Sequence, residues 1–196
     1  FYASVEIRDN PALKNKAVLI GGDPKKNRGH GVRATANYLA RQYGAHSAMP
    51  TAKAIRLIPA EKLVIIQPHF EKYRAVSAEI HRLMHKMTDR VESVALDEAY
   101  LDVTENKLHL ADPVRIATIL QEQIYQKVGL TSSFGVSYNK FLAKMGSEYA
   151  KPFGRTVIQP ETALDFLAKQ KIEKFPGIGP KTQERLAEMG VYTGAD

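Results

Sequence analysis

Two adjacent acidic residues, Asp97 and Glu98, stand inside a strand-forming run, Val91–Thr104. Neighbouring side chains on a regular strand point to opposite faces, so these carboxylates can meet at one ion only if the backbone turns there. A hairpin with strands over Val91–Leu96 and Ala99–Val103 supplies that turn. Carboxylate oxygens suit a hard cation such as Mg²⁺, and two such ions can clamp the attacking and leaving oxygens of a phosphoryl transfer. The alternative is a pair of solvated acids at an ordinary turn.

A second set of residues could bind phosphate groups. Thr35, Tyr38 and Arg41 follow one another at steps of three, and the last two share a face on the first turn of a predicted helix. A helix N-terminus favours anions, and guanidinium and hydroxyl donors would complete a cradle for a triphosphate. The alternative is an exposed Arg41 and a half-buried Tyr38 on an ordinary helix.

Charge and composition narrow the functional classes. The 196 residues carry a net charge of +7, and residues 1–60 hold ten Lys and Arg against three Asp and Glu, which equals the whole excess. Such an excess favours phosphate-bearing partners, although it also serves solubility. Without cysteine there is no disulfide and no thiolate metal site. No apolar run approaches the ~20 residues of a membrane span, and no signal peptide opens the chain, so we expect a cytoplasmic protein without a membrane partner.

These residues need a scaffold of mixed strands and helices. Short β-rich runs predict strands at residues 16–22, 32–36, 63–67, 91–104, 131–137 and 155–159. Helical spacing of apolar residues predicts helices at residues 38–43, 51–57, 70–87, 113–127, 139–149, 162–169 and 180–189. Thr51 is the predicted cap of the second helix, and Asp23–Gly31 is a predicted polar turn. The first 155–160 residues therefore form an α+β body, and a small helical unit follows.

Three segments resemble one family. Leu-Asp-Glu-Ala-Tyr-Leu-Asp, residues 96–102, closely resembles the S-L-D-E-A-Y-L-D signature of Y-family, DinB-like translesion DNA polymerases, with Ala95 where serine is usual. Residues 35–50 follow the family pattern T-A-N-Y-x-A-R-x-[FY]-G-[VI]-x-S-x-M-P, with Ala45 in place of the usual valine or isoleucine. Residues 140–154 resemble its N-K-x-L-A-K…x-K-P-x-G segment, with Phe153 in place of the more common asparagine.

The resemblance implies a role for each candidate residue. Asp97 and Glu98 fall at the carboxylates that bind two Mg²⁺ ions, and Asp102 is expected to be structural. The residues expected to hold the triphosphate of an incoming dNTP are Thr35, Tyr38, Arg41 and Lys151. The opening residues Phe1–Glu6 look like the stretch after D-x-D-x in these enzymes. Tyr2 then falls at the steric gate, the aromatic residue that packs under the sugar and excludes a ribose 2′-hydroxyl.

The end of the chain carries a fourth motif. Pro176-Gly177-Ile178-Gly179-Pro180-Lys181 resembles the first hairpin of a helix-hairpin-helix. Glycines in such a hairpin let backbone amides approach a DNA phosphate without reading the base sequence. The residues expected at DNA are therefore Gly177, Gly179 and Lys181.

The resemblance also implies a division into polymerase domains. A palm would comprise residues 1–9 and 70–159 with an antiparallel or mixed sheet, small fingers residues 10–69, and a partial all-helical thumb residues 160–196. The family's first metal-binding aspartate would lie a few residues before Phe1. The little-finger domain that grips template DNA, and the tail that binds the sliding clamp, would follow Asp196. We therefore expect this stretch, taken alone, to be inactive or nearly so.

Three functions are compatible with these features. The first is template-directed, error-prone DNA synthesis on primer-template DNA from dNTPs. The second is a non-catalytic DNA-binding or damage-recognition module, based on the basic N-terminal segment and the hairpin. The third is another palm-type enzyme such as a nucleotide cyclase, which also uses paired carboxylates and Mg²⁺. The hairpin at residues 176–189 speaks against the cyclase, because that chemistry needs no contact with DNA phosphates.

Overall fold

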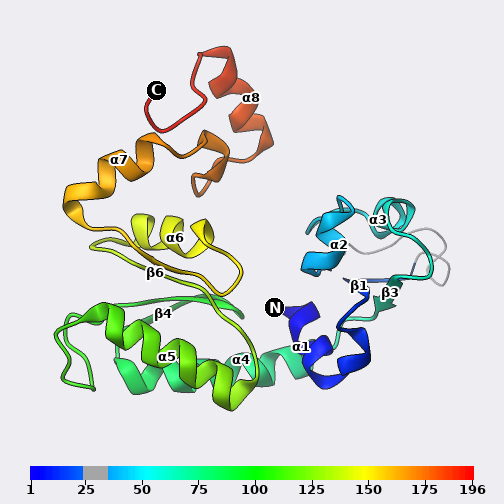
Figure 1. Cartoon of the computed structure of the whole chain (residues 1–196), viewed down its shortest axis with the longest axis horizontal. Coiled ribbons are helices and arrows are strands. Elements are labelled where there is room, and N and C mark those ends of the chain that lie inside the picture. The colour runs from blue at the N-terminus through cyan, green and yellow to red at the C-terminus, as the bar shows by residue number, and fades with distance from the viewer. Residues whose placement is uncertain (24–34) are drawn as a thin grey trace. The chain divides into compact units, whose positions relative to one another are not determined.

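The structure is a computed structural model that describes residues 1–23 and 35–196 (Figure 1). The chain divides into two compact units: a first unit of Phe1–His81 and Val94–Glu98, and a second unit of Arg82–Ser93 and Ala99–Asp196. Helices and small sheets alternate along the chain, which confirms the predicted α+β class. Residues 24–31 of the predicted turn and residues 32–34 of the predicted strand lie outside the described residues.

A three-stranded sheet forms the centre of the first unit. β1 (Ala17–Ile20) lies between β2 (Thr35–Ala36), to which it is antiparallel, and β3 (Leu63–Ile66), to which it is parallel. Every residue of β1 is buried, as its continuous apolar run predicts for a strand covered on both faces. Around β1 and the helices α2 (Tyr38–Gln42) and α3 (Thr51–Leu57) lies a cluster of buried residues. Its members are Ala17, Leu19, Ala36, Ala40, Ala45, Met49, Ala54 and Ile58.

Two further helices belong to the first unit in whole or in part. α4 spans Phe70–Met87, the range predicted from apolar spacing, and its residues Tyr73, Val76 and Ile80 are buried. The opening residues form α1 (Tyr2–Asp9), followed by a short 3-10 helix at Pro11–Leu13. Eight residues of mixed polarity carry too weak a periodic signal for a sequence-based prediction of α1.

The second unit has a parallel strand pair at its centre. β6 (Phe134–Val136) pairs with β7 (Arg155–Val157), so both strands are shorter than the predicted ranges 131–137 and 155–159. The helices α5 (Pro113–Val128) and α6 (Lys140–Tyr149) agree with prediction to within a residue. A Cβ added at Gly135 would come within 2.1 Å of the Ala143 carbonyl oxygen, so β6 and α6 pack backbone against backbone. Only glycine permits that approach.

The hairpin that carries the acidic pair also forms. β4 (Val91–Ala95) and β5 (Glu98–Leu101) make a two-stranded sheet with a turn at residues 96–97. The predicted hairpin is therefore confirmed, with Glu98 as the first residue of the second strand instead of the last residue of the turn.

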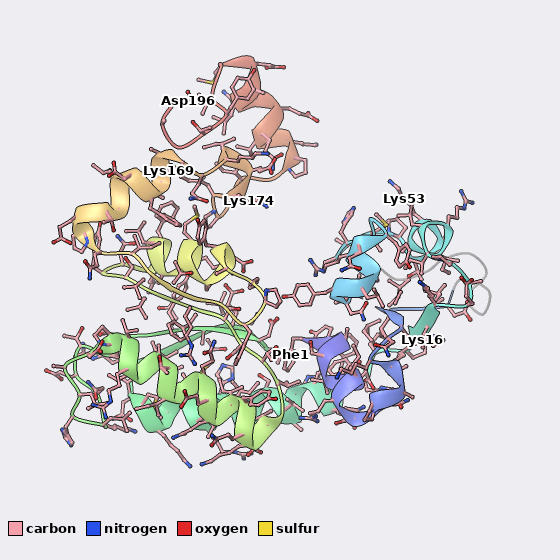
Figure 2. The ribbon with its side chains drawn as sticks, viewed as in Figure 1. Phe1, Lys16, Lys53, Lys169, Lys174 and Asp196 are labelled. Atoms are coloured by element: carbon pink, nitrogen blue, oxygen red, sulfur yellow. The ribbon has the colours of Figure 1, made fainter. Side chains whose placement is uncertain are left out.

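The last part of the second unit is helical, as predicted (Figure 2). α7 (Ala163–Ala168) and α8 (Pro180–Glu188) are flanked by 3-10 turns at Pro160–Thr162 and Ile172–Lys174. The C-terminal residues fold back on the segment after α7, since Gly194 N–H donates to the Gln170 carbonyl oxygen at 2.9 Å and Ile172 N–H donates to the Tyr192 carbonyl oxygen at 2.8 Å. Among the helices of the described residues, none is both long and apolar enough to cross a membrane.

The ends of the helices follow local rules with one correction. Asn139 caps α6, its side chain accepting a hydrogen bond from Leu142 N–H at 2.9 Å, and Gly129 ends α5 in the left-handed conformation with φ 72°. The prediction that Thr51 caps α3 is wrong, because Thr51 is already the first helical residue and Pro50 occupies the cap position. Proline has no side-chain acceptor for that role.

Candidate functional site

The acidic pair lies at the tip of the hairpin. Asp97 is exposed and Glu98 is half-buried. In the first unit, the buried hydroxyl of Ser77 on α4 donates a hydrogen bond to the Leu96 carbonyl oxygen at 2.5 Å, which ties the turn to the helix. The sequence did not single out Ser77, because a serine within a helix is usually solvated or bonded to its own helix.

The donors at this turn suit a hard cation. Asp97 and Glu98 offer carboxylate oxygens on consecutive residues of a bent backbone, and Mg²⁺ prefers oxygen ligands of this kind. Within residues 1–23 and 35–196, no group of three or more His, Cys, Asp or Glu side chains is arranged to hold a metal ion. Among the described residues, the acidic groups at this turn are therefore a pair of adjacent carboxylates, Asp97 and Glu98, and no larger cluster.

Asn37 lies between Thr35 and Tyr38, two of the residues predicted to bind phosphate. The Asn37 side chain accepts hydrogen bonds from Ala40 N–H at 2.9 Å and Val18 N–H at 3.0 Å and donates to the Lys16 carbonyl oxygen at 2.9 Å. These bonds fix the start of α2 to β1. The sequence did not assign Asn37 a role, although asparagine before a helix is a known capping signal.

Tyr38 and Arg41 both lie on α2, and Thr35 precedes the helix in β2. Tyr38 is 55% exposed, so much of this residue faces solvent. Arg41 donates from Nε to the Ala36 carbonyl oxygen and from Nη2 to the Ser47 hydroxyl, both at 3.1 Å, which orients its guanidinium. The predicted contribution of the helix N-terminus is reduced, because α2 has five residues and Asn37 already accepts from one of its first amides.

Tyr2, on α1, stands in a group of aromatic rings. Its ring lies almost parallel to the ring of Tyr73, with centroids 4.5 Å apart and an interplanar angle of 14°. The ring of Phe70 meets both of them edge-on, with centroids 5.9 Å and 6.1 Å away. The Tyr2 ring therefore packs against two other rings, that of Tyr73 stacked on it and that of Phe70 edge-on to it.

Beside these rings lies Glu6, a buried carboxylate that the sequence did not single out. Its oxygen Oε1 accepts hydrogen bonds from the Tyr73 hydroxyl and from His69 Nδ1, and Oε2 accepts one from Lys72 Nζ, all at 2.8 Å. Burial raises the pKa of Glu6, but the bonds from Lys72, His69 and Tyr73 outweigh that effect and hold the pKa below its usual value. Burial, with the Glu6 carboxylate accepting its proton, raises the pKa of Tyr73 to about 12.

Lys151 lies in the second unit, just after α6. Its Nζ is 2.7 Å from Glu148 Oε1, and Lys144 Nζ is 3.2 Å from the same oxygen. Burial raises the pKa of Glu148, but the hydrogen bonds and charges of Lys151 and then Lys144 outweigh it and lower the pKa. Phe153, two residues on, has φ 57°, in the left-handed region where asparagine is favoured over bulky residues.

Other residues of the matched segments have structural contacts. Asp102 pairs with Arg90 at 3.2 Å and accepts a hydrogen bond from Thr104 N–H at 3.0 Å, which fits the structural role expected of it. Lys140 pairs with Glu92 and lies over the ring of Tyr100, 5.7 Å from its centroid.

The glycine hairpin leads into α8. Gly177 has φ 87°, a left-handed conformation that glycine adopts without strain, and Gly179 is the residue before the helix. A Cβ added at either glycine would meet no atom of the described residues within 4 Å, so the backbone there faces open space. Lys181, on the first turn of α8, is exposed, as are Lys169 and Lys174 in the preceding segment (Figure 2).

Two family models match the chain. The model of the impB/mucB/samB family matches residues 1–148, and the model of the IMS family HHH motif matches residues 160–191. The chain belongs to the impB/mucB/samB family. The second match coincides with the helical segment in which the sequence predicts a helix-hairpin-helix.

Named relatives of this impB/mucB/samB chain are DNA polymerases. DNA polymerase IV of Streptococcus pyogenes serotype M5 (strain Manfredo) and DNA polymerase IV of Streptococcus pneumoniae serotype 4 (strain ATCC BAA-334 / TIGR4) are each 53% identical to it over 196 residues. The matched region is all of this chain but only 53% and 55% of those two proteins. The chain thus spans about half the length of the relatives it matches.

Solved structures give the same assignment. The crystal structure of DinB from Sulfolobus solfataricus superimposes with a TM-score of 0.87 at 34% identity, covering 98% of this chain and 55% of that one. The insertion ternary complex of Dbh DNA polymerase gives a TM-score of 0.86 at 34% identity, with 98% and 56% coverage. These matches confirm both the Y-family, DinB-like resemblance and the α+β fold that the sequence motifs indicated.

Proposed function

We propose that the protein carrying this chain is a template-directed, translesion DNA polymerase. The primer 3′-hydroxyl attacks the α-phosphate of a bound dNTP, and pyrophosphate leaves. The observation that carries this proposal is the carboxylate turn at Asp97 and Glu98 within a chain of the impB/mucB/samB family. Two Mg²⁺ ions, when bound, would activate the attacking oxygen and neutralise charge on the leaving group.

The side chains of this chain bind and orient the reactants. Asp97 and Glu98 supply the metal-binding oxygens. The triphosphate would be held by Thr35, Tyr38, Arg41 and Lys151. The exposure of Tyr38 and the oriented Arg41 guanidinium support this assignment, because charge-assisted hydrogen bonds to phosphate are strong and directional. Tyr2 would pack under the sugar and exclude a ribose 2′-hydroxyl.

DNA binding would use the helical tail. Gly177, Gly179 and Lys181 would contact a DNA phosphate, which the open backbone at both glycines supports. We keep the domain assignment of palm (residues 1–9 and 70–159), fingers (10–69) and thumb (160–196). A little-finger domain, a clamp-binding tail and a cytoplasmic location complete the proposal.

Primer extension with Mg²⁺ and dNTPs tests the proposal on the protein as encoded. Asp97→Ala should lower the extension rate on the order of a thousandfold, because it removes a metal ligand. The matched control is Asp89→Ala, which removes a highly exposed carboxylate paired with Lys107 and should leave the rate unchanged. An Asp97→Ala protein as active as its parent would remove Asp97 from the reaction.

The same assay applies to the 196-residue chain by itself. We propose that it extends primers weakly or not at all, because Asp97 and Glu98 alone are few ligands for two ions and the described residues hold no larger cluster. Robust synthesis by this chain would refute that statement.

The alternative is a non-catalytic DNA-binding or damage-recognition module, favoured by the IMS family HHH motif match over residues 160–191. DNA binding and extension separate the two. Under the polymerase proposal, Asp97→Ala binds primer-template DNA as its parent does and loses extension. Under the alternative, the parent protein also binds DNA and extends nothing.

A further inference from the structure

Glu6 and Tyr2 lie on one face of α1. They are four residues apart, which places their side chains one helical turn from each other. Both side chains contact the same residue of α4, Tyr73: Tyr2 stacks on its ring and Glu6 accepts a hydrogen bond from its hydroxyl. The ring and the hydroxyl of Tyr73 are therefore both held by residues of α1.

Tyr73 has no freedom to move away from these contacts. Its side chain is fully buried, and Phe70 packs edge-on against its ring. The Tyr73 hydroxyl must keep a hydrogen-bond partner, because a buried donor left unsatisfied costs free energy. The Glu6 carboxylate is that partner, and it is itself held in place by His69 and Lys72.

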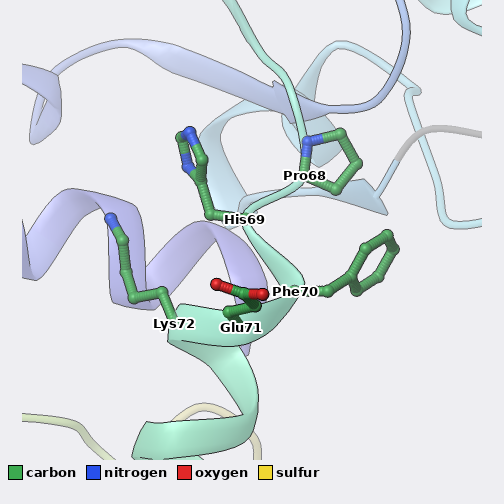
Figure 3. A pocket seen from close by; sticks show the side chains of 5 residues that line it. All are labelled: Pro68, His69, Phe70, Glu71 and Lys72. Carbon is green, nitrogen blue, oxygen red and sulfur yellow. The ribbon is translucent and has the colours of Figure 1, made fainter.

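The first turn of α4 and the residue just before it, His69, carry the groups that hold Glu6 (Figure 3). The side chains of His69 and Lys72 point to one side of the start of α4, and the ring of Phe70 points to the other. A pocket lined by residues 68–72 opens here. An ionised carboxylate only accepts hydrogen bonds, so His69 must carry its proton on Nδ1 toward Glu6.

A buried ion pair such as Glu6–Lys72 is seldom more stabilising than apolar side chains packed in the same space. Replacing a buried charged pair with apolar side chains of similar volume often leaves stability unchanged or improves it. Directional bonds fix side-chain orientation in a way that apolar packing does not. The Glu6 cluster therefore suits a role in positioning better than a role in stability alone.

We propose that Glu6 is a positioning residue that acts through Tyr73 to hold the ring of Tyr2, and that it thereby sets the discrimination between deoxyribonucleotides and ribonucleotides. This inference rests on the proposed function, in which Tyr2 is the steric gate. A gate acts by close contact with the sugar, so a small displacement of its ring admits the 2′-hydroxyl.

The test compares insertion of a dNTP and the matching rNTP by the protein as encoded, through the ratio of their kcat/KM values. Tyr73→Phe keeps the stacked ring and removes the hydroxyl, and Glu6→Met keeps the volume and removes the acceptor. Each should lower the ratio on the order of tenfold, mainly through a lower KM for the rNTP. The double variant should be no worse than Glu6→Met alone, because both changes remove the same Glu6–Tyr73 hydrogen bond.

Two matched variants complete the design. Glu6→Gln retains an oxygen that can accept from Tyr73 and should retain the parental ratio. Asp9→Asn changes a neighbouring carboxylate that also contacts Lys72, at 3.3 Å, and should leave the ratio unchanged. A purely structural role for Glu6 would instead lower both kcat/KM values together and leave their ratio as it was.

Tyr2→Ala is the reference that separates the two levels of the proposal. If Tyr2→Ala lowers the ratio while Tyr73→Phe and Glu6→Met leave it unchanged, the role of Glu6 is refuted and the gate stands. If Tyr2→Ala leaves the ratio unchanged, the assignment of Tyr2 as the gate is refuted, and the role proposed for Glu6 is refuted as well. Should Glu6→Met fail to fold, Tyr73→Phe alone decides, since it retains the ring and its packing.

Discussion

Glu6 in the first unit and Glu148 in the second are both carboxylates paired with lysine, but Glu6 is buried and Glu148 is exposed. Each carboxylate contacts lysine, and in each case those contacts lower its pKa. The Glu6 side chain is 7% exposed and has partners on His69 and on two residues of α4, whereas the Glu148 side chain is 45% exposed and is shared by two lysines.

The difference separates two uses of a carboxylate. Burial makes every hydrogen bond to Glu6 costly to break, so the cluster can hold neighbouring rings in place. Exposure makes the Glu148 pairs weak, so water or a ligand phosphate can replace Glu148 as the partner of Lys151. The first arrangement suits positioning and the second suits exchange with a substrate.

The largest expected difference between Glu6 and Glu148 is in what each contributes to the free energy of unfolding. Glu6→Met should lower the free energy of unfolding by about 2–4 kcal/mol, because it leaves the buried Tyr73 hydroxyl without its acceptor and breaks the bond to Lys72. Glu148→Met should cost less than about 1 kcal/mol, as exposed ion pairs do. Urea unfolding of both variants measures this, and equal costs would break the comparison.

The second prediction concerns alkaline pH. Tyr73 has a pKa of about 12 in the folded chain against 10.0 for the free side chain, so the unfolded chain loses this proton first. The contribution of the Tyr73 proton to the free energy of unfolding is complete below pH 10. It is lost as the pH rises toward 12, by about 2–3 kcal/mol in total. Tyr73→Phe should flatten this loss in unfolding measurements across that range. Tyr149→Phe, which removes an exposed hydroxyl beside Glu148, is the control, and an unchanged slope in Tyr73→Phe would contradict the prediction.

The third prediction tests the exchange assigned to Lys151. Lys151→Ala should raise the KM for dNTP about tenfold, because a charge-assisted contact to phosphate is lost. Lys144→Ala removes the other lysine paired with Glu148 and is the matched control, with KM unchanged. Glu148→Gln frees Lys151 and should leave the KM equal or lower. Steady-state insertion kinetics give all three values, and a rise in KM with Lys144→Ala alone would reassign the contact.

The smallest expected effect is at Phe153, next to the Lys151 segment. Its φ of 57° strains a bulky residue, although its ring lies 6.0 Å from that of Tyr125. Phe153→Asn should raise the free energy of unfolding by up to about 1 kcal/mol, since asparagine tolerates this conformation. Phe153→Leu, which keeps a branched apolar side chain, should show no gain. A loss of stability with asparagine would mean that the ring contact outweighs the strain.

Local patterns predicted most of the elements. Apolar spacing placed α4 at residues 70–87, and the acidic pair within strand-formers predicted the turn between β4 and β5. Both signals act within a few residues, where backbone geometry and patterning agree. Prediction failed where neighbouring packing decided the outcome, as in the short strands β6 and β7, whose pairing ends within three residues.

Motifs likewise placed the candidate site but not its supports. The sequence singled out Tyr2, Tyr38, Arg41 and Asp97 from their motifs, whereas Asn37, Ser77 and Glu6 gain their contacts only in the fold.

The sequence by itself determined the family, the order of the elements and the identity of the residues with chemistry to offer. The tertiary structure alone decided that Glu6 meets Tyr73, 67 positions along the chain, and that Tyr73 meets Tyr2. The physical reason is the range of the forces involved. Helical spacing and turns act between near neighbours in sequence, while the bonding partner of a buried carboxylate is chosen by which distant helix packs against it.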